Sequence, residues 1–313
     1  MPTARAGLGA AAVNGKIYAF GGKNSSYVST LEVYDPGTNT WTAKASMSIP
    51  RAYFGVAAAD GKIYAIGGRD ATYGYNYTEI YDTANNTWTL KASLPTARMY
   101  LGAASIDGNI YTFGGKLSND YDSVEMYNPN INAYEIKTGM PTARYGLVTV
   151  EAGGIIYAIG GCKTTSTNTL TTVEAYDPAT TIWTNENDYF TARAFMGAVE
   201  MDGKIYAAGG KRADNLATSV LEAYNMAAET WEAKANMSVA RTELSVAAVD
   251  GKLYAIGGCN TSGQAIGLVE EYDPASNTWT TKANMPTPRY RLGVIAVNGH
   301  IYAIGGYSAQ AGR

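Results

Sequence analysis

An eight-residue stretch, GKIYAIGG at positions 61–68, returns with small changes along the whole chain of 313 residues. The second glycine of each copy lies at positions 22, 68, 115, 161, 210, 258 and 306. Successive copies are 46 to 49 residues apart. A regular period of this size indicates an array in which each repeat is one supersecondary unit stacked on its neighbours. We therefore expect residues 1–313 to form a single domain rather than several independent ones.

One repeat, residues 51–98, contains four short runs with strand character. They are FGVAAA, KIYAIGG, TEIYD and TWTLKA, and the first two are joined by the turn Asp60-Gly61. An Asp-Gly turn between such runs is a strong hairpin signal, and short strands with frequent turns predict all-β structure. No stretch has a sustained helical period. Four antiparallel strands per repeat predict one blade of a β-propeller.

The pattern within each repeat resembles the kelch repeat, in which a GG pair ends the second strand and a Tyr and a Trp follow. The third-strand tyrosines are Tyr34, Tyr81, Tyr127, Tyr176, Tyr224 and Tyr272. The fourth-strand tryptophans are Trp41, Trp88, Trp183, Trp231 and Trp279, and the third repeat has Tyr134 at this position. The resemblance implies a kelch-type β-propeller over nearly the whole chain. The indole N–H of each Trp is expected to reach a backbone carbonyl between blades.

The two halves of the repeat do not occur equally often. The GG half occurs seven times and the Tyr-Trp half six times, which predicts six complete four-stranded blades plus a terminal two-stranded half-blade at 290–306. A seven-fold ring is favoured, because an apolar hairpin needs neighbours to pack on. The alternative is a six-bladed ring with a redundant hairpin. In either case the half-blade has an open strand edge, which favours edge-mediated self-association.

Composition excludes several classes of protein. The net charge is −3 and no basic run occurs, which argues against nucleic-acid binding. No apolar run approaches the roughly 18 residues of a membrane span, and no signal peptide opens the chain. We therefore expect a soluble protein, and the sequence leaves its compartment open. The two cysteines, Cys162 and Cys259, hold equivalent positions in non-adjacent repeats, so both are expected to be free thiols.

The sequence shows no constellation for catalysis. The one histidine, His300, lies in a hairpin turn where four other repeats have Lys. Copper oxidases with kelch repeats need two histidine ligands, so this class is excluded. No metal-ligand spacing, nucleophile elbow or phosphate-binding loop occurs, and we expect no metal, no cofactor and no enzymatic activity. An epimerase-like sugar-modifying enzyme is the alternative, with acid–base chemistry limited to Asp, Glu, Arg and Tyr.

Arginines and glutamates recur at fixed register. An Arg precedes each first strand, at positions 5, 51, 98, 144, 193, 241 and 289. A Glu shortly precedes each third-strand Tyr, at positions 32, 79, 125, 174, 222 and 270. These residues predict ion pairs that knit the blades together, with each Arg within reach of a third-strand Glu in the same or the next blade, since a buried Arg is rarely unpaired. Arg289 is the exception, because its half-blade has no equivalent Glu. A ring of unpaired arginines would instead indicate an acidic ligand.

Eleven of the 25 tyrosines lie outside the repeat motif. They are Tyr27, Tyr53, Tyr73, Tyr75, Tyr77, Tyr100, Tyr121, Tyr145, Tyr189, Tyr290 and Tyr307. All fall between the second and third strands or between one blade and the next, and Phe54, Phe190 and Phe195 fall in the latter links. Up-and-down topology places both loop types on one face. The loops after GG differ among repeats while the opposite turns are nearly identical, which is typical of binding loops on a constant scaffold.

These patterns predict a non-catalytic module that recognises a peptide or protein on the Tyr-rich loop face. Carbohydrate recognition by stacking on the same tyrosines is the second hypothesis. The alternative for the loop tyrosines themselves is that they are tolerated in loops or fill the channel. The candidate ligand-binding residues are Tyr53, Tyr73, Tyr75, Tyr100, Tyr145, Phe195, Tyr290 and Arg291.

Overall fold

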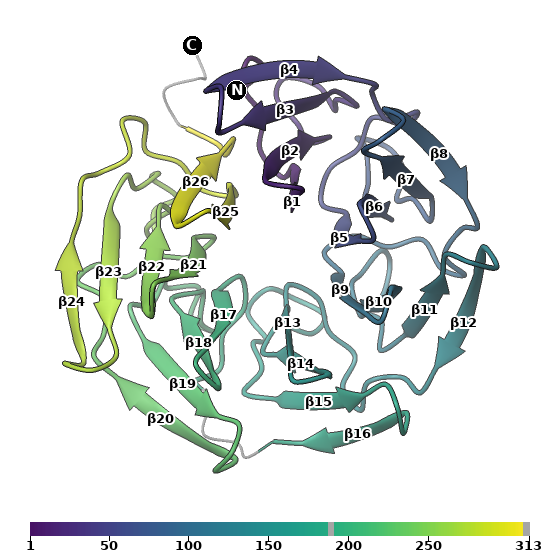
Figure 1. Ribbon diagram of the computed structural model, residues 1–313. Helices are drawn as coiled ribbons and strands as arrows, with labels where there is room; N and C mark the ends of the chain where they lie inside the picture. Colours follow the sequence, from purple (N-terminus) through teal and green to yellow (C-terminus); the bar gives the residue numbers. More distant parts are fainter. Residues whose placement is uncertain (187–190, 309–313) are drawn as a thin grey trace. The chain divides into compact units, whose positions relative to one another are not determined.

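A computed structural model describes residues 1–186 and 191–308 as an all-β chain. Six four-stranded sheets and one two-stranded sheet contain the strands of these residues, which confirms the predicted six blades plus a half-blade. Within each sheet the strands are antiparallel and lie in chain order (Figure 1). Among the described residues, no helix is long and apolar enough to cross a membrane.

The chain divides into two compact units. The first comprises Met1–Tyr145 and Ile304–Gly306 and contains three of the four-stranded sheets. Its strands are β1 (Gly9–Val13), β2 (Lys16–Phe20), β3 (Leu31–Asp35), β4 (Thr40–Lys44), β5 (Gly55–Ala59), β6 (Lys62–Ile66), β7 (Thr78–Asp82), β8 (Thr87–Lys91), β9 (Gly102–Ile106), β10 (Asn109–Phe113), β11 (Val124–Asn128) and β12 (Ala133–Lys137).

The second unit comprises Gly146–Ala303 and the residues from 307 onward, with three four-stranded sheets and the terminal hairpin. Its strands are β13 (Val148–Ala152), β14 (Ile155–Ile159), β15 (Val173–Asp177), β16 (Ile182–Asn185), β17 (Gly197–Met201), β18 (Lys204–Ala208), β19 (Leu221–Asn225), β20 (Thr230–Lys234), β21 (Ser245–Val249), β22 (Lys252–Ile256), β23 (Val269–Asp273), β24 (Thr278–Thr281), β25 (Gly293–Val297) and β26 (His300–Ile304), whose last residue, Ile304, belongs to the first unit. The single domain over 1–313 and the seven-fold ring stay predictions.

Neighbouring sheets within a unit pack through their second and third strands. In the first unit, Phe20 of β2 stacks on Phe54 and tilts against Trp88, with both pairs of ring centroids 5.6 Å apart. Ile63 and Tyr81 of the next sheet belong to the same buried cluster. Burying such side chains contributes roughly 25 cal/mol per Å² of apolar area. The small residues of the first strands and the large residues of the outer strands thus serve the contact between sheets.

The fourth-strand Trp of one sheet also bonds to the preceding sheet. The indole N–H of Trp88 donates to the carbonyl of Ala45 at 2.8 Å, as the sequence predicted. Asn86, two residues earlier, accepts from the amide of Ala45 at 2.9 Å. Tyr134, which replaces Trp in the third repeat, bonds instead through its hydroxyl to Thr78.

The GG pairs link adjacent sheets through the backbone. Gly67 and Gly68 have φ values of +68° and +95°, which L side chains rarely adopt. The amide of Gly68 donates to the carbonyl of Arg98, the arginine of the following repeat, at 2.9 Å. In the first unit the amide of Gly306 makes the same bond to Arg5 at 2.8 Å. The paired glycines therefore have a structural role in every repeat.

The terminal hairpin packs on the sixth sheet. Leu292 before β25, together with Ile301 and Ala303 of β26, contacts a cluster that includes Ile256 and Met285. Within the described residues β26 pairs only with β25, so its other edge has no strand beside it. The hairpin is thus a half-blade attached to its predecessor, with the open edge that the sequence predicted.

Candidate ligand-binding site

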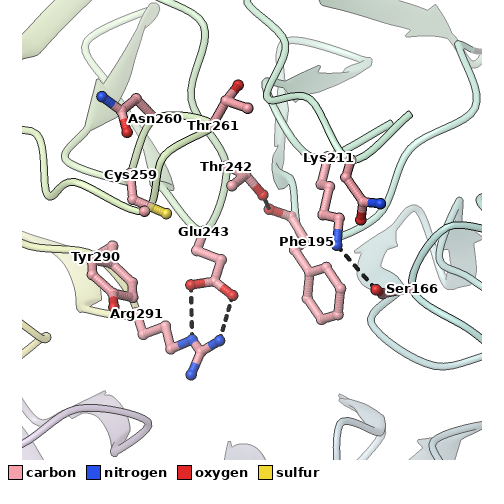
Figure 2. Close-up of a pocket in the computed structure, with 12 residues that line it drawn as sticks. Ser166, Phe195, Lys211, Thr242, Glu243, Cys259, Asn260, Thr261, Tyr290 and Arg291 are labelled. Carbon is pink, nitrogen blue, oxygen red and sulfur yellow. Dashed lines mark hydrogen bonds and ion pairs between the residues drawn. The ribbon is translucent and has the colours of Figure 1, made fainter. Parts of the chain in front are cut away.

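The loops of the second unit enclose a pocket of about 510 Å³ (Figure 2). Phe195, Glu243 and Arg291 come from three successive links between a fourth strand and the next first strand. Lys211 and Cys259 directly follow the glycine pairs of β18 and β22. Both loop types therefore gather at one site in this unit, as the topology predicted.

The links reach the pocket through an unusual backbone. Phe195, Glu243 and Arg291, each two residues after the repeated Arg, have φ values of 54°, 54° and 53°. Their amides form a relay, from Glu243 to the Phe195 carbonyl at 2.9 Å and from Arg291 to the Glu243 carbonyl at 3.1 Å. Left-handed φ is rare for bulky residues and costs of order 1 kcal/mol each, and such positions cluster at ligand sites.

The first unit repeats the same geometry with tyrosine. Tyr53 and Tyr100 have φ values of 59° and 55°, and the Tyr100 amide donates to the Tyr53 carbonyl at 3.0 Å. Their rings lie 4.9 Å apart, and Tyr145 lies 6.5 Å from Tyr100. The left-handed position therefore recurs on the same backbone in both units, and it presents Tyr in the first unit and Phe, Glu or Arg in the second.

Charge in the pocket is unequally compensated. The guanidinium of Arg291 holds Glu243 with two hydrogen bonds, from Nε at 2.8 Å and from Nη2 at 2.6 Å. Lys211 donates to the hydroxyl of Ser166 at 3.0 Å and makes no ion pair within the described residues. The pocket is thus lined by the Arg291–Glu243 ion pair, whose charges balance, and by the Lys211 ammonium, which among the residues described bonds only to the neutral hydroxyl of Ser166.

The cysteine of the pocket is a buried thiol. Both cysteines are free and buried, which confirms the prediction made from their spacing. Burial is the main cause that raises the pKa of the Cys259 thiol to about 11, and Glu243 adds to it. The thiolate, which is the reactive form, is therefore scarce at neutral pH.

We expect the Cys259 thiol to react with iodoacetamide about 100-fold more slowly at mildly alkaline pH than a thiol of pKa 9.0. Mass spectrometry of the native and urea-unfolded chain gives the two rates at this site. The native rate should keep rising to about pH 11, whereas simple inaccessibility would give a rate that stays low throughout. A native rate equal to the unfolded one would contradict the prediction.

The predicted site residues fall into two groups. Phe195, Tyr290 and Arg291 line the pocket of the second unit. In the first unit Tyr53 and Tyr100 are half-buried, and Tyr145 is buried with Lys116 over its ring at 4.0 Å. That all six share one concave surface stays a prediction.

Tyr73 and Tyr75 lie in the loop before β7. Tyr73 is 64% exposed, whereas the hydroxyl of Tyr75 donates to Asp70 at 2.5 Å. This hydrogen bond to a carboxylate is the main cause that raises the pKa of Tyr75 to about 12. Tyr73 is therefore available for contact and Tyr75 is fixed within its loop. Tyr189 and Phe190 lie outside the described residues.

The sequence analysis missed a set of cations. Four of the seven residues that directly follow a GG pair are basic: Lys23, Arg69, Lys116 and Lys211. Each pairs through a β-bridge with the residue after the repeated Arg, next to the left-handed position. The signal was in the loop sequences, whose first letters are K, R, K and K in these repeats.

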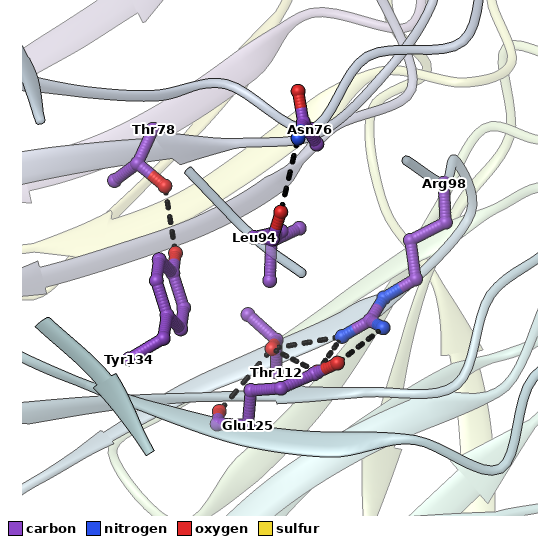
Figure 3. A network of polar contacts seen from close by, with 7 residues as sticks. All are labelled: Asn76, Thr78, Leu94, Arg98, Thr112, Glu125 and Tyr134. Carbon is purple, nitrogen blue, oxygen red and sulfur yellow. Dashed lines mark hydrogen bonds and ion pairs between the residues drawn. The ribbon is translucent and has the colours of Figure 1, made fainter. Parts of the chain in front are cut away.

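Five of the repeated arginines pair with the third-strand glutamate, as predicted. The guanidinium of Arg98 is fully buried and meets Glu125 of β11, and Thr112 of β10 bonds to both (Figure 3). Each of these pairs lies within one repeat, which is one of the two predicted arrangements, and none of the five joins two sheets. The side chain of each Arg therefore holds the link before the first strand to the third strand of the same sheet. The backbone carbonyl of the same Arg accepts a hydrogen bond from the GG pair of the neighbouring sheet.

Groups expected to be non-functional lie away from the pocket. His300 is exposed at the start of β26, with Nδ1 2.9 Å from the carbonyl of Asn298. Within residues 1–186 and 191–308 no group of three or more His, Cys, Asp or Glu side chains has metal-binding geometry.

Comparison with known proteins gives a consistent fold. Residues 1–115 and 103–306 match the family described as the KLHDC2/KLHL20/DRC7 Kelch-repeats domain. A mouse (Mus musculus) protein described as an influenza virus NS1A-binding protein homolog is 48% identical over 52 residues, which are 16% of this chain and 8% of that protein. The solved structure described as that of YjhT aligns with a TM-score of 0.70 at 18% identity, over 85% of this chain and 93% of the other.

Proposed function

Because the chain belongs to the kelch-repeat β-propeller family, we propose that it is a non-catalytic module that binds a peptide or protein segment through its aromatic loops. The segment carries an acidic side chain beside an aromatic or apolar one. The observation that carries this proposal is the pocket that Lys211, Arg291 and Phe195 line together. Arg291 is balanced by Glu243, so the pocket has an excess of positive charge.

A protein ligand suits the side chains that are present. Aromatic residues and Arg give large contact area at low entropic cost, which is typical of protein-binding surfaces. The mouse relative is itself named for binding a protein. The exposed ring of Tyr73 favours carbohydrate as the second candidate, because a flat accessible ring can stack on a sugar.

An epimerase-like activity has less support. The one histidine lies outside the pocket, and the pocket's one carboxylate, Glu243, is held by Arg291 at 2.6 Å. A general acid or base must reach the proton that it transfers, and both carboxylate oxygens of Glu243 already accept hydrogen bonds from Arg291.

Selection from a library of random peptides, run beside a glycan array, tests the proposal. We expect acidic peptides with an aromatic or apolar neighbour to be enriched. Lys211→Ala should weaken their binding about 10-fold or more, since a hydrogen bond to a charged group contributes about 1.5–3 kcal/mol. Phe195→Gly should weaken it by about 30-fold or more, as for a central aromatic contact, and glycine suits the φ of 54° at this position.

Arg212→Ala is the matched control, because Arg212 is adjacent to Lys211 and is half exposed in an ion pair with Asp214. It should leave affinity nearly unchanged. Peptides that bind Lys211→Ala and Phe195→Gly as well as the original chain would contradict the pocket. Enrichment on the glycan array alone would favour the second candidate.

A further inference from the structure

The open edge of β26 borders a groove of about 360 Å³ in the second unit. Tyr254, Ile256 and Met285 of the sixth repeat line the groove, and Ile301 and Ala303 line it from β26. In the six complete sheets the residue equivalent to Ile301 is fully buried under a third strand. Ile301 is only partly buried. The groove therefore lies where the third and fourth strands of a seventh sheet would pack.

Arg289 holds the geometry of the other repeated arginines. Its Nη2 donates to the carbonyl of Ala303 at 3.3 Å, as Arg51 does to Ala65 at 3.0 Å. In the complete repeats the guanidinium also meets the third-strand Glu, as Arg51 meets Glu79. A third strand beside β26 would bring its Glu opposite Ala303, the register that Glu79 has opposite Ala65.

The groove also repeats the anchor for the fourth strand. In the second unit the amide of Ala235 donates to Asn277 at 2.9 Å, and the carbonyl of Ala235 accepts the indole N–H of Trp279 at 2.7 Å. Ala45 makes the same pair of bonds in the first unit. Ala283 is the equivalent residue one repeat later, and it lines the groove with an exposed side chain.

We propose that the β26 edge and this groove dock a strand–turn–strand segment of a partner polypeptide. The segment carries an apolar–Glu–x–Tyr strand and then Asn-x-Trp at the start of a second strand. Its first strand pairs with β26, its Glu meets Arg289, and its Asn and Trp bond to the amide and carbonyl of Ala283. Main-chain pairing supplies affinity and the side-chain pockets supply specificity, as in strand addition to a sheet edge.

Charge favours this segment over a second copy of β26. The sequence of β26 is HIYAI, which has no acidic residue to place beside Arg289. The third strands of the complete sheets all carry Glu in this register. In a second copy of the chain, the third and fourth strands of the complete sheets already pair within their own sheets.

A synthetic peptide of residues 268–281, LVEEYDPASNTWTT, is the probe for the proposed segment. We expect it to bind the intact chain and to slow hydrogen exchange at β26 and at Ala283. In the peptide, Glu270→Gln should weaken binding about 10-fold through the lost charged hydrogen bond. Trp279→Ala should weaken it about 30-fold, as for an aromatic anchor in a pocket.

Two variants of the chain distinguish this edge from the loop pocket. Arg289→Met should weaken the original peptide and remove the difference between it and the Glu270→Gln peptide, because the two residues act as a coupled pair. Lys211→Ala should leave peptide binding unchanged. Loss of binding in Lys211→Ala, or protection of the loop pocket instead of β26, would overturn the proposal, because the peptide would then bind in the loop pocket.

Self-association is the other outcome of the same experiment. If β26 amides become protected as the chain concentration rises and the peptide fails to compete, the edge pairs with a second copy and the proposal is wrong. A scrambled peptide that binds as tightly as the original would overturn it equally, because an open strand edge alone would then explain the binding.

Discussion

The Arg98→Leu chain is expected to unfold with a free energy about 3–5 kcal/mol lower than the original, because Glu125 is left charged and buried. The side chain of Arg98 is fully buried and that of Glu125 is 3% exposed, so water cannot replace the lost partner. Urea unfolding followed by tryptophan fluorescence measures the difference. A loss below about 1 kcal/mol, the range of exposed ion pairs, would contradict the burial of this pair.

The double variant Arg98→Leu/Glu125→Leu distinguishes two causes of the lost stability: the missing ion pair, and the cost of leaving the Glu125 carboxylate buried without a partner charge. Replacing a buried ion pair by packed apolar residues is often neutral or stabilising, so the second change should recover most of the loss. Arg212→Ala, in the exposed pair with Asp214, serves as the control and should cost much less. A double variant as unstable as the single one would indicate that hydrogen bonds such as that from Arg98 to Thr112 stabilise the sheet more than the charge does.

The strands and blades could be predicted because the same sequence pattern recurs in every repeat. The GG pair, the third-strand Tyr and the fourth-strand Trp have local physical roles, and the contact of Trp88 with the Ala45 carbonyl is a role of this kind. The pairing of Arg51 with Glu79 was also predictable, since both recur in register. The sequence did not predict whether each Arg pairs with a Glu of its own sheet or of the neighbouring sheet, because spacing does not distinguish a partner in the same repeat from one in the next.

The candidate site was predicted less completely than the strands and the repeat motif. Phe195 and Arg291 were found by their position after the repeated Arg, but their left-handed backbone was invisible, because neither residue favours positive φ. Lys211 was missed because the search followed aromatic residues, whereas the cations recur at one position of loops that otherwise differ. The anchoring role proposed for Ala283 could not be read from the sequence because it rests on main-chain groups, and the bonds of Ala45 and Ala235 suggest it by analogy.

The Gly67→Ala chain is expected to lose several kcal/mol of unfolding free energy. Gly67 has a φ of +68°, where any L side chain is strained by about 1–2 kcal/mol. A Cβ there would also lie 2.5 Å from the carbonyl oxygen of Arg98. Because that oxygen is backbone and already accepts the Gly68 amide at 2.9 Å, it cannot move without breaking the bond between neighbouring sheets. The clash therefore adds to the conformational strain.

Gly61→Ala is the matched control for this prediction, since Gly61 has a nearly identical φ of +71° in the hairpin turn before β6. A Cβ at Gly61 would meet only the hydroxyl of Thr83 at 3.9 Å, an ordinary contact. Its variant should therefore show the conformational cost of about 1–2 kcal/mol alone. The difference between the two variants measures the steric requirement of the sheet-to-sheet bond. Equal losses in urea unfolding would mean that the GG pair is needed only for its φ and that the close approach to Arg98 is readily relaxed.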